Sequence, residues 1–455
     1  MKPNQNVWVG ERKMLGTAEE KCEELFKRWL SPQVEFVNEK VEEAYKARVT
    51  RIKDAIQLKK KPDRVPIFPL IGFFPAYYVG LTPYDMMYDY EKLKMAFKKY
   101  VMDFEPDAHC GAIGPGPGRF FEILDYKLYA WPGHGVSPQH SYQCIEGEYM
   151  KAEEYDALIQ DPTYYFLTVY FPRIFGALEP FKKLSPFTNV LEMYGGFTPV
   201  NFLAFGMPDV QNALKALVEA GNEAIKWIGH VVSWERDITA AGFPNLFGGG
   251  TKAPFDTIGD TLRGTRGIML DMYRRRDKLI QAMEVFTPLM IKMGANTAKA
   301  NGNPIVFIPL HKGADGFISN KQFEEFYWPT LKKVIIGLIN EGCVPFLYAE
   351  GSYNSRLELI KKDLPKGKTL WGFDQTDMAK AKEIIGDVAC IAGNVPSALL
   401  SVGTPKEVKE YVKKLIYDCG EGGGFILMNG AVIDEAKPEN VKAMVDAGKE
   451  YGAYK

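Results

Sequence analysis

Three residues that could do proton or metal chemistry close apolar runs of the kind that form buried strands. His311 closes PIVFIPLH, Glu350 closes CVPFLYAE and Asp374 closes KTLWGFD. One imidazole and two carboxylates can bind a zinc ion, or can donate and accept protons. We therefore predict that Glu350, His311 and Asp374 are catalytic, and that Glu350 and His311 are the ligands of any metal.

Each of these residues also has a purely structural explanation. Glu350 could occupy a surface turn, and His311 could be a hydrogen-bonded histidine without a chemical role. Asp374 precedes the helix-like stretch TDMAKAKEIIG and could cap it. His134 and His140 lie in a segment rich in proline and glycine and could belong to a lid.

Aromatic and strand-end residues suggest a wall for a planar ligand. Tyrosines occur in the stretches GFFPAYY and YGGFTPVNF, and another tyrosine ends the run 344–348. An asparagine closes DVACIAGN. Aromatic rings offer large contact areas with a polar end. The predicted substrate-binding residues are Tyr77, Tyr78, Tyr194, Tyr348 and Asn394.

The elements that position these residues alternate between apolar runs and helical patterns. Helical stretches such as 320–342 and 404–422 separate the later runs. Repeated strand and helix units favour a (β/α)₈ TIM barrel, in which the active site lies at the carboxyl ends of the strands. A doubly wound open sheet is the alternative. The runs are 64–72, 107–114, 188–196, 304–311, 343–351, 368–374, 387–394 and 423–431.

The domain organisation follows from the same pattern. Residues 1–60 are charged and helical, so we expect an N-terminal helical extension. Residues 61–455 then form the barrel, with long insertions at about 115–185 and 197–300. Long insertions on a barrel usually decorate the end that carries the site.

Composition narrows the functional classes. The chain has 56 basic and 57 acidic residues, a balance that argues against nucleic acid as a partner. No apolar run approaches 18 residues, and the N-terminus has no apolar signal-peptide core, so we expect no membrane segment and a cytoplasmic protein. Six dispersed cysteines without a CxxC pair predict reduced thiols. The runs GPGPG and GGG lack the contexts of nucleotide-binding motifs.

Several longer motifs resemble the uroporphyrinogen decarboxylase superfamily. They are RVPI, GGFTPVNFLAFG, FEEFYWPTLKKVI, GNVPSALLSVGTPKEVKEYV and GGGFILMNGAVIDEAKPENVKAMVDAGKEYG. The resemblance covers roughly residues 60–455 and is closer to the corrinoid-linked methyltransferase branch, which includes cobalamin-dependent demethylases. It implies a (β/α)₈ barrel with its site in a deep cleft.

The chain departs from both branches of that superfamily. The haem-pathway decarboxylase holds substrate carboxylates with arginines near its first strand, but PLIGFFPAYYVG contains none. The methyltransferases typically bind zinc through His-x-Cys-Gly at the fifth strand end and Gly-Cys at the last. Here those positions read Tyr348-Ala349-Glu350-Gly351 and Gly430-Ala431, so Glu350 stands where the first cysteine would be.

The resemblance therefore predicts an O-demethylase-like methyltransferase. It would move a methyl group from a methoxylated or other methylated small molecule to the cobalt of a corrinoid. The corrinoid would belong to a separate protein, because this chain has no DxHxxG motif. Zinc held by Glu350 and His311 would fit oxygen coordination. A metal-free decarboxylase or lyase and a non-catalytic binding protein are the alternatives, and a homo-oligomer is left open.

Overall fold

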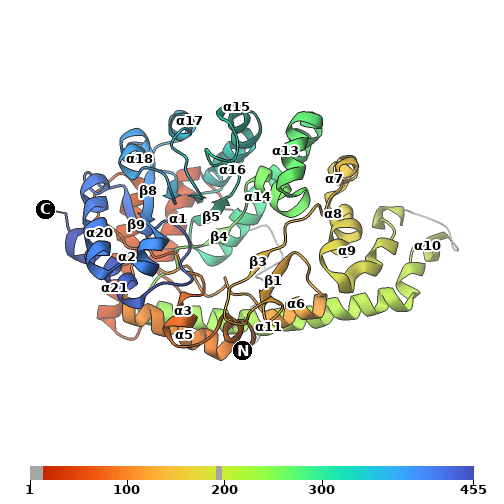
Figure 1. Ribbon diagram of the computed structural model, residues 1–455, viewed down its shortest axis with the longest axis horizontal. Helices are drawn as coiled ribbons and strands as arrows, with labels where there is room; N and C mark the ends of the chain where they lie inside the picture. The colour runs from red at the N-terminus through yellow and green to blue at the C-terminus, as the bar shows by residue number, and fades with distance from the viewer. Residues whose placement is uncertain (1–13, 191–196, 455) are drawn as a thin grey trace.

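The computed structural model describes residues 14–190 and 197–454, and its centre is a parallel sheet (Figure 1). Six strands pair in sequence order, each parallel to the next. These strands are β4 Gly249–Gly250, β5 Ile305–Leu310, β6 Val344–Ala349, β7 Leu370–Phe373, β8 Cys390–Val395 and β9 Phe425–Asn429.

Two further segments close the sheet into a barrel. Residues 66–68 exchange hydrogen bonds of 2.8 and 2.9 Å with Leu427 of β9. The amide of Asp107 donates to the carbonyl of Ile67 at 2.9 Å, and His109 exchanges two hydrogen bonds with residues 244–246 just before β4. The described residues thus form a closed ring of eight parallel segments, which confirms the predicted (β/α)₈ barrel.

The barrel interior is filled by every second residue of each strand, because side chains alternate between the two faces of a sheet. From β6, for example, Phe346 and Tyr348 point inward, while Leu347 faces the surrounding helices. Helices α1 (Ala18–Leu30) and α2 (Glu39–Gln57) add Phe26 and Ile52 to this interior cluster and cover the end where the strands begin. Their N-termini are capped by Thr17 and Asn38.

Helices surround the barrel, as strand–helix alternation requires. After the third barrel segment they are α12 Pro254–Asp256, α13 Gly264–Arg274, α14 Arg276–Asn301, α15 Asn320–Gln322, α16 Trp328–Asn340, α17 Leu357–Asp363, α18 Met378–Ile385, α19 Ser397–Val402, α20 Pro405–Cys419 and α21 Pro438–Tyr451. Short π-helical turns, η6 Thr257–Leu262 and η7 Phe323–Tyr327, join α12 to α13 and α15 to α16.

The third barrel segment is not where the sequence pattern put it. We expected a strand at 188–196, but residues 187–189 form a 3₁₀ turn and residues 191–196 lie outside the described residues. The segment is instead 244–250, within FPNLFGGG. A Cβ on Gly248 would lie 1.9 Å from the carbonyl oxygen of Asn303, so close packing demands glycine there. These glycines removed the side-chain pattern that marks a strand.

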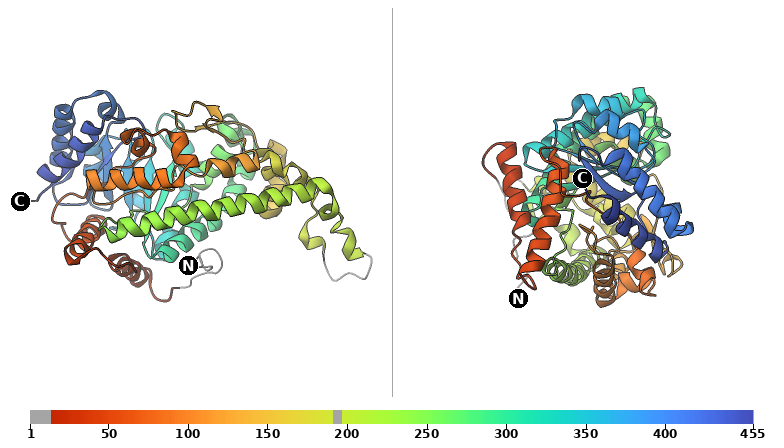
Figure 2. Two further views of the ribbon diagram at one scale, coloured as in Figure 1. Left: turned by 90° about the horizontal axis from the view of Figure 1, so that it is seen from below. Right: turned by 90° about the vertical axis from the view of Figure 1, so that its left-hand side faces the viewer.

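The segment between the second and third barrel strands forms a lobe beside the barrel (Figures 1 and 2). Its longest element is α11 (Pro208–Ala240), whose N-terminal half packs on α6 (Gly118–Leu124) and η3 (Gly176–Lys183). A three-stranded sheet of β1 Tyr129–Pro132, β2 Gly135–Val136 and β3 Gln143–Cys144 crosses from this lobe toward the barrel. The other helices of this segment are α7 Tyr155–Gln160, α8 Pro162–Tyr165, α9 Phe171–Ile174 and α10 Phe197–Val200. Three more helices, α3 Phe74–Tyr78, α4 Pro83–Tyr88 and α5 Tyr90–Phe104, lie between the first and second barrel segments. Within the described ranges, no helix has the length and apolar character to cross a membrane.

Candidate active site

Strand parity and register bring three predicted residues to one rim of the barrel. Side chains of β6 alternate between the two faces of the sheet, so Glu350 points to the same side as the inward-facing Phe346 and Tyr348. Leu310 of β5 pairs with Ala349 of β6, so the residues that follow them, His311 and Glu350, lie side by side. Asp374 follows in the next strand, since Ala349 pairs with Phe373. Together they line a cavity of about 490 Å³, with Ala314, Gly316, Phe317, Gly351, Ser352 and Gln375.

His311 lies between two carboxylates. Its Nδ1 is 2.6 Å from Oδ2 of Asp260, and its Nε2 is 3.5 Å from Oε1 of Glu350. Burial opposes the imidazolium, but the hydrogen bond to Asp260 and the charge of Glu350 outweigh it and raise the pKa of His311. The arrangement therefore favours a protonated imidazole whose Nε2 faces Glu350 and the cavity.

Asp260 connects this histidine to two lysines. Its oxygens lie 2.7 Å from Nζ of Lys252 and 3.1 Å from Nζ of Lys312. Although burial disfavours the carboxylate, the hydrogen bond from His311 and the charge of Lys252 lower the pKa of Asp260 well below its usual range. Asp260 is therefore an anion that three cationic groups share.

Asp256 accepts hydrogen bonds from the backbone of the turn that carries His311. This side chain is fully buried and accepts hydrogen bonds from the amides of His311 and Lys312, both at 3.0 Å. The hydroxyl of Tyr327 donates to it at 2.6 Å. Burial, together with the nearby charge of Asp260, raises the pKa of Asp256. Its contacts make it a positioning residue for the turn after β5.

The two remaining rim carboxylates differ in their surroundings. Burial raises the pKa of Glu350, and the charge of His311 opposes that rise only in part. Asp374 accepts a hydrogen bond from the amide of Gly351 at 3.1 Å, which ties the ends of β6 and β7 together. Asp374 is not the cap of the following helix, because Asp377 occupies that position and accepts from the amide of Lys380.

The structure places four of the five predicted substrate-binding residues away from the lining of this cavity. Tyr348 is 2% exposed and donates to the carbonyl of Gly430 inside the barrel, while Asn394 donates to the carbonyls of Asp374 and Thr376. Tyr77 donates to the carbonyl of Gln139. Tyr78 donates to Asp103, and Tyr194 lies outside the described residues.

His134 and His140, the two histidines considered for a lid, lie in the loops that connect β1, β2 and β3. His134 stacks on Trp131 and contacts Glu122 at 2.8 Å. His140 lies 3.7 Å from Glu435. Neither histidine lines the cavity described above.

Sequence reasoning missed Lys252, Asp256 and Asp260, which all follow the third barrel segment. The signal was present in GGGTKAPFDTIGD, where two aspartates four residues apart share one face of a helical turn. Because the preceding glycines concealed the strand, the loop that follows it was not recognised as part of the rim.

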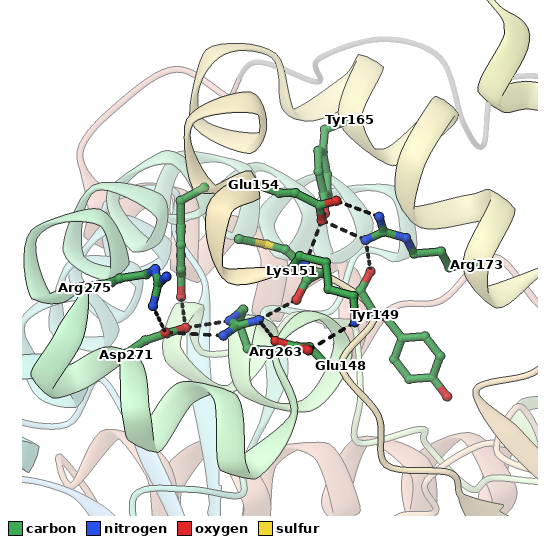
Figure 3. Close-up of polar contacts among 11 residues, drawn as sticks. Glu148, Tyr149, Lys151, Glu154, Tyr165, Arg173, Arg263, Asp271 and Arg275 are labelled. Atoms are coloured by element: carbon green, nitrogen blue, oxygen red, sulfur yellow. Dashed lines mark hydrogen bonds and ion pairs between the residues drawn. The ribbon is translucent and has the colours of Figure 1, made fainter.

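A network of charges fastens the turn that carries Asp260 (Figure 3). Arg263, one residue after η6, is 3% exposed and contacts Asp271 at 2.5 Å, and it also contacts Glu148. It donates to the carbonyl of Met150 at 2.6 Å as well. The segment around Glu148 is thereby held against the C-terminal end of η6.

The residues at the rim do not supply the ligand set expected for catalytic zinc. Such sites typically use three protein ligands. Across residues 14–190 and 197–454, no three His, Cys, Asp or Glu side chains are grouped to hold a metal ion. Asp260 occupies Nδ1 of His311, which leaves Nε2 and Glu350 as a pair. This geometry fits proton transfer better than metal coordination.

Comparisons with known proteins point to one family. The family model described as uroporphyrinogen decarboxylase (URO-D) matches residues 238–451, which contain every rim residue described above. The uroporphyrinogen decarboxylase of Pseudoalteromonas translucida (strain TAC 125) is 25% identical over 182 residues, 39% of this chain and 48% of that protein. That of Coxiella burnetii (strain RSA 493 / Nine Mile phase I) is 24% identical over 247 residues, 54% of this chain and 65% of that protein. The chain thus spans about half the length of the curated relatives that it matches first.

Among solved structures, a methyltransferase from Methanosarcina mazei has a similar fold. The TM-score is 0.57 at 17% sequence identity, and the match covers 88% of this chain and 98% of that one. At this level of identity the likeness establishes the shared fold alone. The match over residues 238–451 makes the C-terminal part of this chain, which carries the barrel rim, similar to the uroporphyrinogen decarboxylase family.

Proposed function

We propose that this chain transfers a methyl group from a methoxylated, or otherwise methylated, small molecule to the cobalt of a corrinoid carried by a separate protein. The methyl donor would bind in the cavity at the barrel rim. The similar fold of the Methanosarcina mazei methyltransferase supports this proposal, because it covers nearly the whole of both chains. The curated decarboxylases match over a shorter stretch.

The position of His311 between Asp260 and Glu350 on the cavity wall is the observation that carries the proposal. When a methyl ether is cleaved, its oxygen keeps the electron pair of the broken carbon–oxygen bond. Cobalt(I) supplies the two electrons of the new cobalt–carbon bond. The His311 imidazolium donates its Nε2 proton to the departing oxygen, so that a neutral alcohol or phenol leaves. General acid catalysis of this kind contributes about 10²–10⁴-fold in rate.

Asp260 and Glu350 have separate parts in this step. Asp260 binds Nδ1 and so orients Nε2 toward the cavity, as a carboxylate does for many catalytic histidines. Glu350 stabilises the positive imidazole before transfer and is the carboxylate that faces Nε2, from which that nitrogen could be reprotonated. Asp374 holds the backbone beside Glu350 through Gly351.

A metal-free decarboxylase is the second candidate, because the curated relatives carry that name. It would use His311 or Asp374 as the proton donor. A porphyrinogen with several carboxylates requires cationic partners, yet no lysine or arginine lines the described cavity. Lys252 and Lys312, the nearby cations, are both paired with Asp260. The cavity therefore fits the methyltransferase proposal better.

An anaerobic assay with reduced cobalamin tests the proposal directly. The protein is mixed with a panel of methyl ethers and methylamines, and formation of methylcobalamin is followed by absorbance. We expect turnover with at least one donor, a loss of about 100-fold or more in Glu350→Ala and His311→Gln, and unchanged turnover in Asp446→Asn, a surface carboxylate of α21. Full activity in the Glu350→Ala protein would remove Glu350 from the mechanism.

Metal analysis of the same proteins separates the remaining alternatives. Stoichiometric zinc that disappears in Glu350→Ala would assign Glu350 and His311 as ligands rather than as an acid pair. Decarboxylation that depends on His311 would support the second candidate. A folded protein that binds a methylated ligand without turnover would indicate a binding protein.

A further inference from the structure

A second cavity lies among the loops that lead into the barrel strands, so it is at the opposite end of the barrel from the rim. Its volume is about 320 Å³, and four of the residues that line it are lysines. The loops are 58–61 after α2, 366 before β7, 386–387 before β8 and 422–424 before β9. The lining residues are Leu58, Lys59, Lys60, Lys61, Lys366, Gly386, Asp387, Gly422, Gly423 and Gly424.

Two of the lysines and the one carboxylate of the lining already have ionic partners. The ion pairs are Lys59–Glu19 at 2.7 Å, Lys60–Asp54 at 3.7 Å and Asp387–Lys361 at 3.0 Å. Lys59 and Lys60 also follow the C-terminus of α2, where the negative end of the helix dipole favours cations. These two lysines therefore have a structural explanation, and Asp387 does not neutralise the remaining cations of the lining.

Three ammonium groups at this cavity have no carboxylate partner among the residues that the structure describes. Lys61 lies 4.8 Å from the ring centre of Tyr454, and Lys366 forms no ion pair or hydrogen bond with the described residues. Lys382 of α18 is partly buried, and its Nζ donates to the carbonyl of Gly423 at 2.5 Å, beside the cavity. Burial lowers the pKa of Lys382, and no carboxylate opposes that effect. Lysine is rarely buried without a partner, so an anion is missing from this group.

The glycine loop before β9 adds backbone donors to these charges. Gly422, Gly423 and Gly424 have φ angles of +77°, +82° and +68°, which residues other than glycine rarely adopt. The amide of Gly423 donates to the carbonyl of Gly420 at 3.0 Å, but the amides of Gly422 and Gly424 have no acceptor in the described part of the chain. Successive amides in a turn can form a concave site for an anion. The loop therefore offers two free donors next to Lys382.

We propose that this cavity binds an anion with one or two phosphate groups, held by Lys61, Lys366 and Lys382 and by the amides of Gly422 and Gly424. Phosphate oxygens accept several hydrogen bonds at once, and an ammonium group supplies three donors and a full charge. The cavity is larger than one phosphate group requires, so either pyrophosphate or the phosphates of a nucleotide would fit. The site is separate from the rim and does not depend on the function proposed for it.

A phosphate at this position would join the N-terminal helical extension to the barrel. Lys61 directly follows α2, which contacts β8 and β9, whereas Lys366, Lys382 and the glycine loop belong to the last third of the chain. The bound anion would neutralise cations that otherwise repel one another across this joint. Because only the folded chain assembles the site, the ligand should also raise the thermal midpoint.

Calorimetric titration of the full chain with sodium pyrophosphate tests the site. At low salt we expect one pyrophosphate per chain. Lys366→Gln should weaken binding about 10-fold, as the loss of one charge-assisted hydrogen bond predicts. The double variant Lys61→Gln/Lys366→Gln should abolish binding, and it should keep the wild-type circular dichroism because both side chains are exposed. Lys406→Gln is the matched control, since Lys406 is also exposed but lies at the end of α20 away from the glycine loop.

The same titration with ADP distinguishes the two sources of phosphate. Tighter binding of ADP than of pyrophosphate would identify a nucleotide as the ligand, and equal or weaker binding would identify the inorganic anion. Either result supports the site if the double variant abolishes it. A wild-type protein that binds neither compound at millimolar concentration would overturn the proposal, as would a double variant with wild-type affinity.

Lysine acetylation locates the bound anion in the wild-type protein. The chain is treated briefly with acetic anhydride, with and without saturating pyrophosphate, and the modified lysines are quantified by mass spectrometry. Pyrophosphate should slow the acetylation of Lys61 and Lys366 several-fold, because their ammonium groups are then engaged, and should leave the rate at Lys406 unchanged. Equal rates at Lys61 and Lys366 with and without pyrophosphate would show that the anion does not occupy this cavity.

Discussion

Asp260 Oδ2 lies 2.6 Å from His311 Nδ1, although 51 residues separate the two in the chain. The contact exists because each residue lies shortly after one of two neighbouring strands, β4 and β5, whose carboxyl ends share one rim. Asp260 thereby binds one ring nitrogen and leaves the other for the cavity. The same carboxylate also contacts Lys252 and Lys312. These two lysines therefore weaken the electrostatic effect of Asp260 on the pKa of His311.

Removing the charge of Asp260 should make His311 less basic. In Asp260→Asn the negative charge that raises the pKa of His311 is lost and the hydrogen bond to Nδ1 becomes a weaker, neutral one, while burial, which lowers the pKa, persists. Lys252→Met should have the opposite effect, because it removes a cation that competes for the same carboxylate. The chain has five histidines, so their proton resonances can be titrated by NMR and assigned with His311→Gln. Equal pKa values in the two variants would contradict this account.

The raised pKa of His311 predicts how stability depends on pH. A histidine that is more basic in the folded state stabilises the protein fully below its unfolded pKa of about 6.5, and loses that contribution as pH rises through the folded value. The difference in free energy of unfolding between wild type and His311→Gln should therefore be larger at pH 6 than at pH 9. Urea denaturation at both pH values measures it. A difference that grows with pH would show that the imidazole is held neutral.

Loss of the Asp256 carboxylate should destabilise the fold more than loss of its tyrosine partner. Asp256→Ala leaves the buried Tyr327 hydroxyl without its acceptor, at about 1–3 kcal/mol, and also leaves the part-buried amides of His311 and Lys312 without theirs. Tyr327→Phe removes one hydrogen bond, worth about 1 kcal/mol. Chemical denaturation of both single variants and the double variant gives their coupling. Additive effects would mean that the two side chains do not interact.

The barrel and much of its rim could be predicted because short stretches of sequence are enough to mark most of the strands and the residues at their ends. The apolar runs that end in His311, Glu350 and Asp374 mark buried parallel strands, and strand parity then aims these residues at one cavity. The third barrel segment could not be predicted in this way. Its glycines carry no side-chain pattern, and they are required by atoms from residues 294 and 303, which are distant in sequence. Lys252, Asp256 and Asp260 were missed with it.

Gly248 offers a direct test of that third segment. A Cβ at Gly248 would lie 1.9 Å from the carbonyl oxygen of Asn303 and 2.7 Å from its carbonyl carbon, both backbone atoms just before β5. Gly248→Ala should therefore force β4 and β5 apart and destabilise the protein by about 3 kcal/mol. Gly206→Ala is the matched control, since nothing lies within 4 Å of its Cβ position, and its effect should stay within about 0.5 kcal/mol. Because β4 leads into the turn that carries Asp260, Gly248→Ala should also lower the pKa of His311, whereas Gly206→Ala should not. If both alanine variants were equally stable, the segment 244–250 would not pack against the start of β5 as described.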